Sequence, residues 1–119
     1  MKPRFALAAA LAAFAPAVNA QDAAAGKTVF AQCSVCHQPD STNGVGPGLQ
    51  DVVGRKSGTA AGFRFSRAMK NAGITWDEKT LDAYVADPQK AVPGNVMPFS
   101  GIADAKQRAD LIAYLKTLK

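Results

Sequence analysis

The sequence has few of the histidines and cysteines that bind metals in proteins. It holds one histidine and two cysteines among 119 residues, which is too few for a structural zinc site because zinc takes four ligands. No stretch alternates polar and apolar side chains as a strand does, and no segment repeats. Arginine clusters are also lacking, so nucleic acid is not an expected partner. These absences leave a single all-α domain as the expected fold.

Residues 1–20 predict a secretory signal peptide. Lys2 and Arg4 precede an apolar run over residues 5–14, and small side chains lead up to Ala20. The apolar run is shorter than the roughly 20 residues that span a bilayer, so a membrane anchor is the less favoured interpretation. We expect cleavage after Ala20, export to the periplasm and no stable insertion into a membrane.

The remaining residues, 21–119, are expected to form one domain of modest positive charge. They keep 12 of the 14 lysines and arginines and all 9 acidic residues, which gives a formal charge of +3. Such a charge suits contact with acidic patches on other proteins. A chain this short is small for an unaided hydrophobic core, so a bound apolar group would help to fill its centre.

The most informative stretch is Cys33-Ser34-Val35-Cys36-His37. Two cysteines two residues apart, followed directly by histidine, form the attachment signature of c-type haem. The two thiols can add to the vinyl groups of one haem while the imidazole ligates its iron. A disulfide, a redox-active thiol pair and half a zinc site are the alternatives. The thiol-redox alternative is weak because no strand or βαβ unit surrounds the motif.

Four helical segments are expected after the signal peptide. The first covers residues 22–31 and begins at Asp22, a suitable N-cap. Gly26 lies in its interior at a cost of about 1 kcal/mol relative to alanine, which a close crossing with another helix would explain. The second helix begins at Ser66 and ends at Gly73, which supplies a left-handed residue.

The third and fourth helices also carry start signals. Thr75 and Glu78 have the spacing of a capping box, with Thr75 as the N-cap, and the helix that they open stops before Pro88. Its apolar face holds Leu81, Tyr84 and Val85. The last helix opens at Asp104 and Gln107. Its continuous apolar stripe consists of Leu111, Ile112, Leu115 and Leu118.

Residues 38–62 and 93–99 are rich in glycine and proline and are expected to be loops. A loop as long as the first is unusual in a compact domain unless it wraps around something. A haem is such a filler. The side chains expected to point inward from this loop are Val45, Leu49, Val52 and Val53.

A haem iron needs a second axial ligand or keeps an open site, and this choice separates an electron carrier from a gas binder or catalyst. A second imidazole is excluded because His37 is the only histidine. Met1 leaves with the signal peptide, so Met69 and Met97 remain. Met69 lies in an expected helix, where filling a gap in the core is its default role. Met97 lies between Pro93 and Pro98, in a loop that these prolines stiffen, which favours Met97 as the ligand.

Further motifs resemble class I cytochrome c of the mitochondrial and bacterial periplasmic type. They follow the family's order through nearly all of the mature chain: Gly46-Pro47-Gly48-Leu49, Gly54-Arg55-Lys56-Ser57-Gly58, Gly73-Ile74-Thr75-Trp76, Tyr84, Pro93-Gly94 before Met97, and Asp110-Leu111-Ile112-Ala113-Tyr114-Leu115. The resemblance implies the cytochrome c fold, in which the N- and C-terminal helices cross and shorter helices and long loops wrap around one covalent haem. In that fold Gly26 and Phe30 would lie against Leu111 and Tyr114.

The resemblance also implies a set of haem-binding residues. They are Cys33, Cys36, His37, Pro47, Arg55, Trp76, Tyr84, Asn95 and Met97, of which His37 and Met97 would ligate the iron. The carbonyl of Pro47 would bond the far nitrogen of His37 and so fix the orientation of the ring.

The other implied roles concern the far side of the haem. Trp76 and Arg55 would bond or neutralise a haem propionate, and Asn95 would contribute in the same area. Tyr84 would sit beside the sulfur of Met97 and tune it through its hydroxyl group.

The sequence departs from the mitochondrial pattern at several positions. Phe65 stands where that type often has a tyrosine, and Met69 where it has a buried asparagine, so both changes remove polar groups from the haem pocket. Gln89 and Val96 occupy positions that hold lysines around the mitochondrial haem edge. Partners of the mitochondrial type therefore do not follow by analogy.

Taken together, these features predict an electron-transfer protein, not an enzyme, because both axial sites of the iron are filled by the chain. The expected donor is a protein such as a quinol-cytochrome c oxidoreductase, and the expected acceptor a terminal oxidase, a reductase or a reaction centre. The carrier itself is expected to be a monomer. The candidate lysines for a basic rim that steers acidic partners are Lys27, Lys56, Lys70, Lys79, Lys90 and Lys106. Ordinary solvated lysines are the alternative.

Overall fold

A computed structural model describes residues 1–3, 6, 8–12 and 21–119. The signal-peptide prediction falls partly on residues 13–20, outside the described part. The helices are α1 (Ala23–Val29), the 3-10 turn η1 (Phe30–Gln32), α2 (Arg67–Asn71), α3 (Glu78–Ala86), α4 (Pro88–Ala91) and α5 (Ala105–Leu115). The described residues form no strand, only one isolated bridge between Lys56 and Thr75. The expected all-α fold is therefore confirmed, and no helix in the described ranges is long and apolar enough to cross a membrane.

Three of the four predicted helix starts are confirmed by their capping hydrogen bonds. The Asp22 carboxylate accepts the backbone N–H groups of Ala24 and Ala25 at 2.9 and 3.1 Å. Ser66 Oγ accepts the N–H of Met69 at 3.1 Å, and the Asp104 carboxylate accepts that of Gln107 at 2.9 Å. Each cap pairs a donor that the first helical turn leaves without an internal partner.

The prediction that Thr75 caps the third helix is wrong. Asp77 is the N-cap of α3, and it exchanges hydrogen bonds of 2.8 Å with the backbone and side chain of Thr80. Thr75 is held in extended backbone instead, because it pairs with Lys56 in the isolated bridge. The N–H of Trp76 also donates to Arg55 across this bridge, at 2.9 Å. The helix therefore begins only where that pairing ends.

Pro88 ends α3 as predicted, but it also starts a helix that the sequence analysis did not anticipate. The carboxylate of Asp87 accepts the N–H of Lys90 at 3.2 Å and so caps the short helix α4. Proline suits the first position of a helix because its missing N–H would have no internal partner there. Asp87 and Pro88 thus form both the end of one helix and the start of the next.

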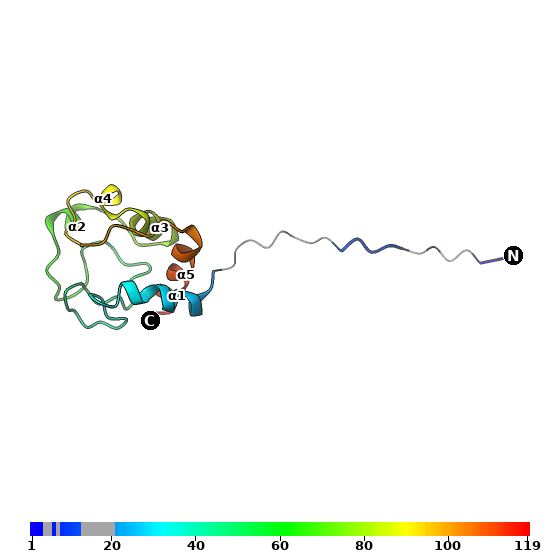
Figure 1. Cartoon of the computed structure of the whole chain (residues 1–119), viewed down its shortest axis with the longest axis horizontal. Helices are drawn as coiled ribbons and strands as arrows, with labels where there is room; N and C mark the ends of the chain where they lie inside the picture. Colours follow the sequence, from blue (N-terminus) through cyan, green and yellow to red (C-terminus); the bar gives the residue numbers. More distant parts are fainter. Residues whose placement is uncertain (4–5, 7, 13–20) are drawn as a thin grey trace.

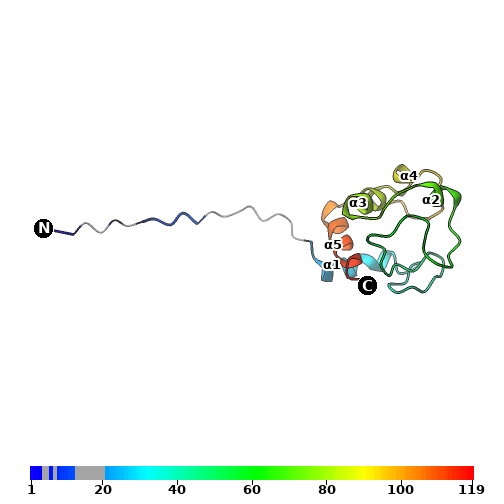
Figure 2. The same cartoon turned by 180° about the vertical axis from the view of Figure 1, so that it is seen from behind.

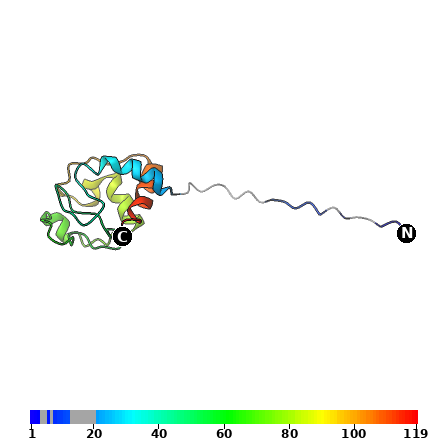
Figure 3. The same ribbon diagram turned by 90° about the horizontal axis from the view of Figure 1, so that it is seen from below.

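Helices α1 and α5 cross in close contact, as the resemblance implied, and they lie side by side in three views (Figure 1, Figure 2, Figure 3). A Cβ atom added to Gly26 would lie 1.8 Å from the carbonyl oxygen of Asp110. Only glycine therefore allows the two backbones to approach this closely. Next to the crossing, the rings of Phe30 and Tyr114 pack with their centroids 5.1 Å apart, and Leu111 is buried.

Residues 38–62 contain no helix, as predicted, and their apolar side chains only partly follow expectation. Val52 is buried, and Leu49 and Val53 pack half-buried against the core. Val45, however, is 76% exposed. Gly44 and Gly46 explain this difference, because the N–H of Gly44 donates to the carbonyl of Gly46 at 2.9 Å. The tight bend leaves Val45 at its exposed tip.

Candidate functional site

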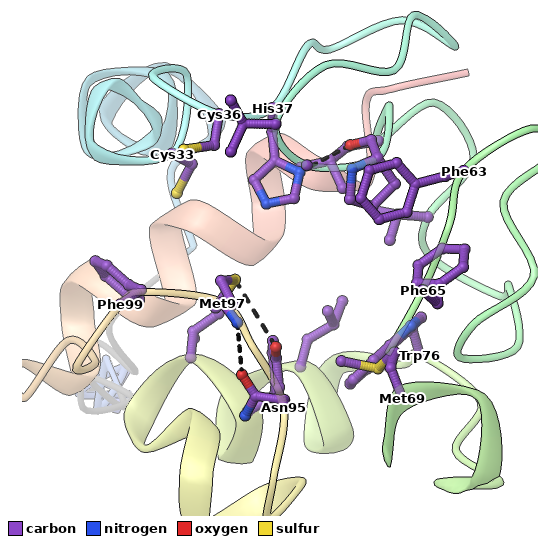
Figure 4. Close-up of a pocket in the computed structure, with 18 of the residues that line it drawn as sticks. Cys33, Cys36, His37, Phe63, Phe65, Met69, Trp76, Asn95, Met97 and Phe99 are labelled. Atoms are coloured by element: carbon purple, nitrogen blue, oxygen red, sulfur yellow. Dashed lines mark hydrogen bonds between the residues drawn. The ribbon is translucent and has the colours of Figure 1, made fainter. Parts of the chain in front are cut away.

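A cavity of about 390 Å³ lies between the segment after α1, the long loop, α3 and the loop before α5 (Figure 4). Its wall is largely apolar, and residues such as Phe30, Val52, Leu81 and Leu111 belong both to the wall and to the buried core. All nine predicted site residues line this one cavity: Cys33, Cys36, His37, Pro47, Arg55, Trp76, Tyr84, Asn95 and Met97. The fold thus brings together residues that are more than half the chain apart.

The imidazole of His37 is held in one orientation. Its Nδ1 lies 2.8 Å from the carbonyl oxygen of Pro47, so Nδ1 carries the hydrogen and donates it. Burial lowers the pKa of His37, helped by the charge of Arg55 and opposed by the bond to Pro47. The neutral ring therefore keeps the lone pair of Nε2 free for a metal. Gly46 packs under the ring, since an added Cβ would lie 2.6 Å from Cε1 of His37.

The two cysteines lie beside this histidine as free, half-buried thiols. The N–H of His37 donates to the carbonyl of Cys33 at 2.9 Å, which brings the motif into a tight turn at the cavity wall. Burial raises the pKa of the Cys33 thiol, which suits a protonated, apolar side chain. The described residues include no group of three or more metal-ligating His, Cys, Asp or Glu side chains.

Met97 enters the same cavity from the loop before α5. Its sulfur accepts a hydrogen bond from the hydroxyl of Tyr84 at 3.8 Å, and its backbone N–H donates to Asn95 Oδ1 at 3.0 Å. Burial raises the pKa of Tyr84 to about 12, so the phenol stays protonated and able to donate. Figure 4 shows Met97 and His37 bordering one open space from separate parts of the chain. The sulfur and the backbone N–H of Met97 are thus each held by a hydrogen bond.

Asn95 does not have the surroundings that the resemblance implied. Its amide nitrogen donates both hydrogens to backbone carbonyls, of Pro88 and Val92, each at 2.9 Å. No amide hydrogen remains for a propionate. The buried carboxamide fastens the Met97 loop to α4, which gives Asn95 a positioning role. Its place near a propionate stays a prediction.

Gln89 shares this task, which the sequence analysis missed. Its side-chain nitrogen donates to the carbonyl of Asn95 at 2.8 Å, and its side-chain oxygen accepts the N–H of Gly94 at 3.1 Å. The only sequence signal was a polar residue one helical turn before a proline-glycine loop. Such a signal is too common to identify a residue that holds a loop in place.

Another methionine, Met69, also lines the cavity. Figure 4 shows it beside Trp76. It packs against the core as an apolar side chain, which agrees with the gap-filling role expected from its helix.

The polar groups of the cavity wall are cationic on one side. Arg55, Lys56 and Arg64 line it, and no aspartate or glutamate does. The guanidinium of Arg55 is anchored by hydrogen bonds to the carbonyls of Gln50 and Gly48, at 3.2 and 3.1 Å. The sequence analysis did not predict Arg64 as a site residue. Arg64 is a single arginine in a loop, and nothing in the sequence around it indicated a site.

Trp76 is 7% exposed and packs against Tyr84 with ring centroids 5.0 Å apart. Its indole N–H makes no hydrogen bond within the described residues, yet no fully buried polar side-chain atom there lacks a partner. The N–H therefore opens onto the cavity.

These donors suit one kind of group. Haem is a flat apolar ring with two carboxylates, and the wall offers apolar packing, cations and a free indole N–H on one side. The thiols of Cys33 and Cys36 stand on the wall beside His37. The residues present fit a covalently attached haem.

The comparisons with known proteins agree with this fit. The sequence model of the family described as Cytochrome c matches residues 23–119. The chain belongs to the cytochrome c family. It is 50% identical to a cytochrome c2 of Rhodomicrobium vannielii over 111 residues, which cover 92% of this chain and 89% of that one. It is likewise 50% identical to a cytochrome c2 of Blastochloris viridis over 107 residues, covering 88% and 84%.

A solved structure shows the same fold. Cytochrome cH from Methylobacterium extorquens superposes with a TM-score of 0.78 at 54% sequence identity, covering 81% of this chain and 98% of that one. The protein is thus a class I c-type cytochrome with the cytochrome c fold. Membership makes it an electron-transfer protein and not an enzyme, with haem c as its cofactor and redox proteins as its partners.

Proposed function

We propose that this cytochrome is a periplasmic one-electron carrier whose haem c is attached through Cys33 and Cys36 and ligated by His37 and Met97. The observation that carries the proposal is that His37 and Met97 line one cavity and that each is held by hydrogen bonds. His37 is oriented by Pro47, and Met97 by Tyr84 and Asn95. When bound, haem supplies a one-electron couple between ferric and ferrous iron, and His/Met ligation raises its reduction potential.

The chain's residues set the conditions for that couple. The Pro47 carbonyl keeps Nε2 of His37 unprotonated and directed by a fixed ring. The hydrogen bond from Tyr84 withdraws electron density from the Met97 sulfur, which makes the thioether a weaker donor to ferric iron. Arg55 and Trp76 offer a cation and an N–H to the propionates. With His37 and Met97 holding the iron, the chain would leave no position on the metal for a substrate.

The route to the periplasm rests on residues 1–20. We propose that they are a signal peptide cleaved after Ala20, leaving 21–119 as a single cytochrome domain. The mature monomer would carry electrons between membrane or periplasmic redox proteins. A quinol-cytochrome c oxidoreductase is the proposed kind of donor, and an oxidase, a reductase or a reaction centre the proposed kind of acceptor.

The ligand assignment is tested by absorption spectroscopy of the purified mature holoprotein. The ferric form should show the weak near-infrared band of methionine sulfur on haem, and the ferrous form should not change on adding carbon monoxide. Met97→Ala should lose the band and gain carbon monoxide binding. Met69→Ala is the matched control, because it removes the other mature-chain methionine of the same cavity, and it should keep the band.

The opposite result would favour an open-site haem protein. Ready carbon monoxide binding by the wild-type ferrous form, without the near-infrared band, would remove Met97 from the ligand set.

Mass spectrometry of protein from the periplasmic fraction tests cleavage of the signal peptide, since the mature N-terminus should be Gln21.

A further inference from the structure

Charged side chains are distributed unevenly around the cavity. Three segments that line it contain no lysine, arginine, aspartate or glutamate: residues 28–39, 41–50 and 91–103. We call these three segments together the uncharged arc. They supply Cys33 and His37, then Pro47, then Met97 to the cavity wall. The cationic residues of the wall come instead from residues 55–64.

The uncharged arc also carries the exposed apolar side chains of the domain. Between residues 21 and 119 the strongly exposed large hydrophobic side chains are Val35, Val45 and Val96, at 82%, 76% and 77% exposure. Val45 and Val96 stand at the edge of the cavity and not in its depth, where Leu81 is buried. Exposed apolar side chains gathered around one site mark a surface that meets another molecule.

The charges nearest to the arc in the sequence nearly cancel. Lys27 and Lys90 flank it, and so do Asp40, Asp51 and Asp104. Of the six lysines expected to form a basic rim, only Lys56 lines the cavity, and it belongs to residues 55–64, outside the arc. The arc therefore presents no field of one sign that would select an acidic partner.

We propose that the uncharged arc is the face on which this cytochrome docks its redox partner, and that the partner presents an uncharged, apolar face in return. The inference rests on the proposed function as an electron carrier. Burial of apolar surface, not attraction between charges, drives the encounter. The rate of electron transfer should therefore change little with ionic strength.

Electron self-exchange between two copies of the holoprotein tests this docking face, because each copy offers the arc to the other. One electron leaves the ferrous copy and enters the ferric copy, and no bond forms or breaks. NMR line broadening in mixtures of the two forms gives the rate. We expect less than about a twofold change in rate between ~0.01 M and ~0.5 M salt, since the arc carries no charge and the formal charge of +3 on each copy lies outside it.

Charges placed on the arc should slow this reaction. The double variant Val35→Lys with Val96→Lys places two positive charges on the arc of each copy, and these repel each other when two copies meet. The rate should fall about fivefold at ~0.01 M salt and return to the wild-type value at high salt, where the charges are screened. Val35→Lys alone leaves the neighbour of Met97 unchanged and should lower the rate about twofold. The matched control is Gln107→Lys with Thr117→Lys, which adds the same charge at exposed positions outside the cavity wall.

A second measurement does not depend on electron transfer. The double arc variant should elute earlier from a hydrophobic-interaction column than the wild-type protein, and the double control should elute later than the arc variant. Equal slowing of self-exchange by the arc and control variants would overturn the proposal, and so would a wild-type rate that changes more than tenfold with salt. A holoprotein unable to cycle between ferric and ferrous forms would defeat the proposed function instead, and the column comparison would still test the arc.

Discussion

The side-chain oxygen of Asn95 accepts a hydrogen bond from the backbone N–H of Met97 over 3.0 Å. The same buried carboxamide donates to two backbone carbonyls of Pro88 and Val92. The Asn95 side chain therefore fastens the loop that carries Met97 to α4, together with the side chain of Gln89. In the proposed ligation, the position of Met97 would therefore depend on a side chain that makes no hydrogen bond to its sulfur.

Replacing Asn95 with alanine should weaken both the fold and the ligation. The variant loses three hydrogen bonds, each worth about 0.5–1.5 kcal/mol, and leaves the N–H of Met97 without its partner. The carbonyls of Pro88 and Val92 still accept the N–H groups of Val92 and Asn95. We expect the free energy of unfolding of the ferric holoprotein to fall by about 3 kcal/mol, measured by denaturant titration. The near-infrared methionine band should disappear at a lower denaturant concentration than in the wild-type protein.

Gln89→Ala is the graded comparison for Asn95→Ala. It removes two hydrogen bonds to the same loop from a more exposed side chain, so its effect should be smaller, about 1 kcal/mol. If the two variants lost the methionine band at the same denaturant concentration, Asn95 would not be the principal anchor of the loop.

Tyr84→Phe should lower the reduction potential while leaving the fold nearly unchanged. The ring remains to pack on Trp76, but the sulfur of Met97 loses its hydrogen-bond donor and becomes a better donor to ferric iron. A weak hydrogen bond of about 1 kcal/mol corresponds to a few tens of millivolts for one electron. Spectroelectrochemical titration measures the shift.

The chain offers a matched control in its other tyrosine. Tyr114 packs on Phe30 at the helix crossing and does not line the cavity. Tyr114→Phe should therefore leave the potential unchanged. Equal potentials for all three proteins would show that the Tyr84 hydroxyl does not act on the sulfur.

Local signals explain which parts of the fold could be predicted. Asp22, Ser66 and Asp104 cap the helices predicted for them because a cap depends only on the next three residues. Thr75 has the same local signal but is not a cap, because its backbone pairs with a distant residue, Lys56. Patterns read along the chain do not contain such a pairing.

The same limit applies within the site. The motif around His37 and the family resemblance selected the residues that line the cavity, but not how each is used. The partners of Asn95 belong to α4, a helix of four residues that has no apolar period to reveal it. Val45 was expected to point inward because valine is apolar, but it stands exposed at the edge of the cavity, where two glycines bend the chain around it.

Gly26→Ala should destabilise the protein, against the usual helix propensity. In an open helix this change would stabilise by about 1 kcal/mol. Here the added Cβ would lie 1.8 Å from the Asp110 carbonyl oxygen, so α1 and α5 must move apart. We expect a net loss of about 3 kcal/mol or more in the free energy of unfolding, by analogy with overpacked cores.

The reverse change on the exposed side of the same helix is the control. Ala24→Gly should cost about 1 kcal/mol by propensity alone. A Gly26→Ala protein as stable as the wild type would mean that the two helices can separate without loss.

Asp110 should contribute to acid sensitivity. Its carboxylate pairs with Lys106 and accepts the backbone N–H of Asp22 at 2.9 Å. These contacts hold the pKa of Asp110 below its ordinary value. A carboxyl group with a lowered pKa in the folded state stabilises the fold above its unfolded pKa of about 3.9, and loses that contribution as the pH falls through the folded value.

The free energy of unfolding should therefore fall below about pH 4 more steeply in the wild-type protein than in Asp110→Asn, which cannot titrate. Lys106→Gln should give an intermediate slope, because it removes the ion pair and keeps the bond to Asp22. Denaturant titrations of the three proteins at several pH values between 2 and 6 measure the slopes. Since α1 joins α5 through this carboxylate, parallel curves for wild type and Asp110→Asn would mean that the junction of the two helices does not depend on its charge.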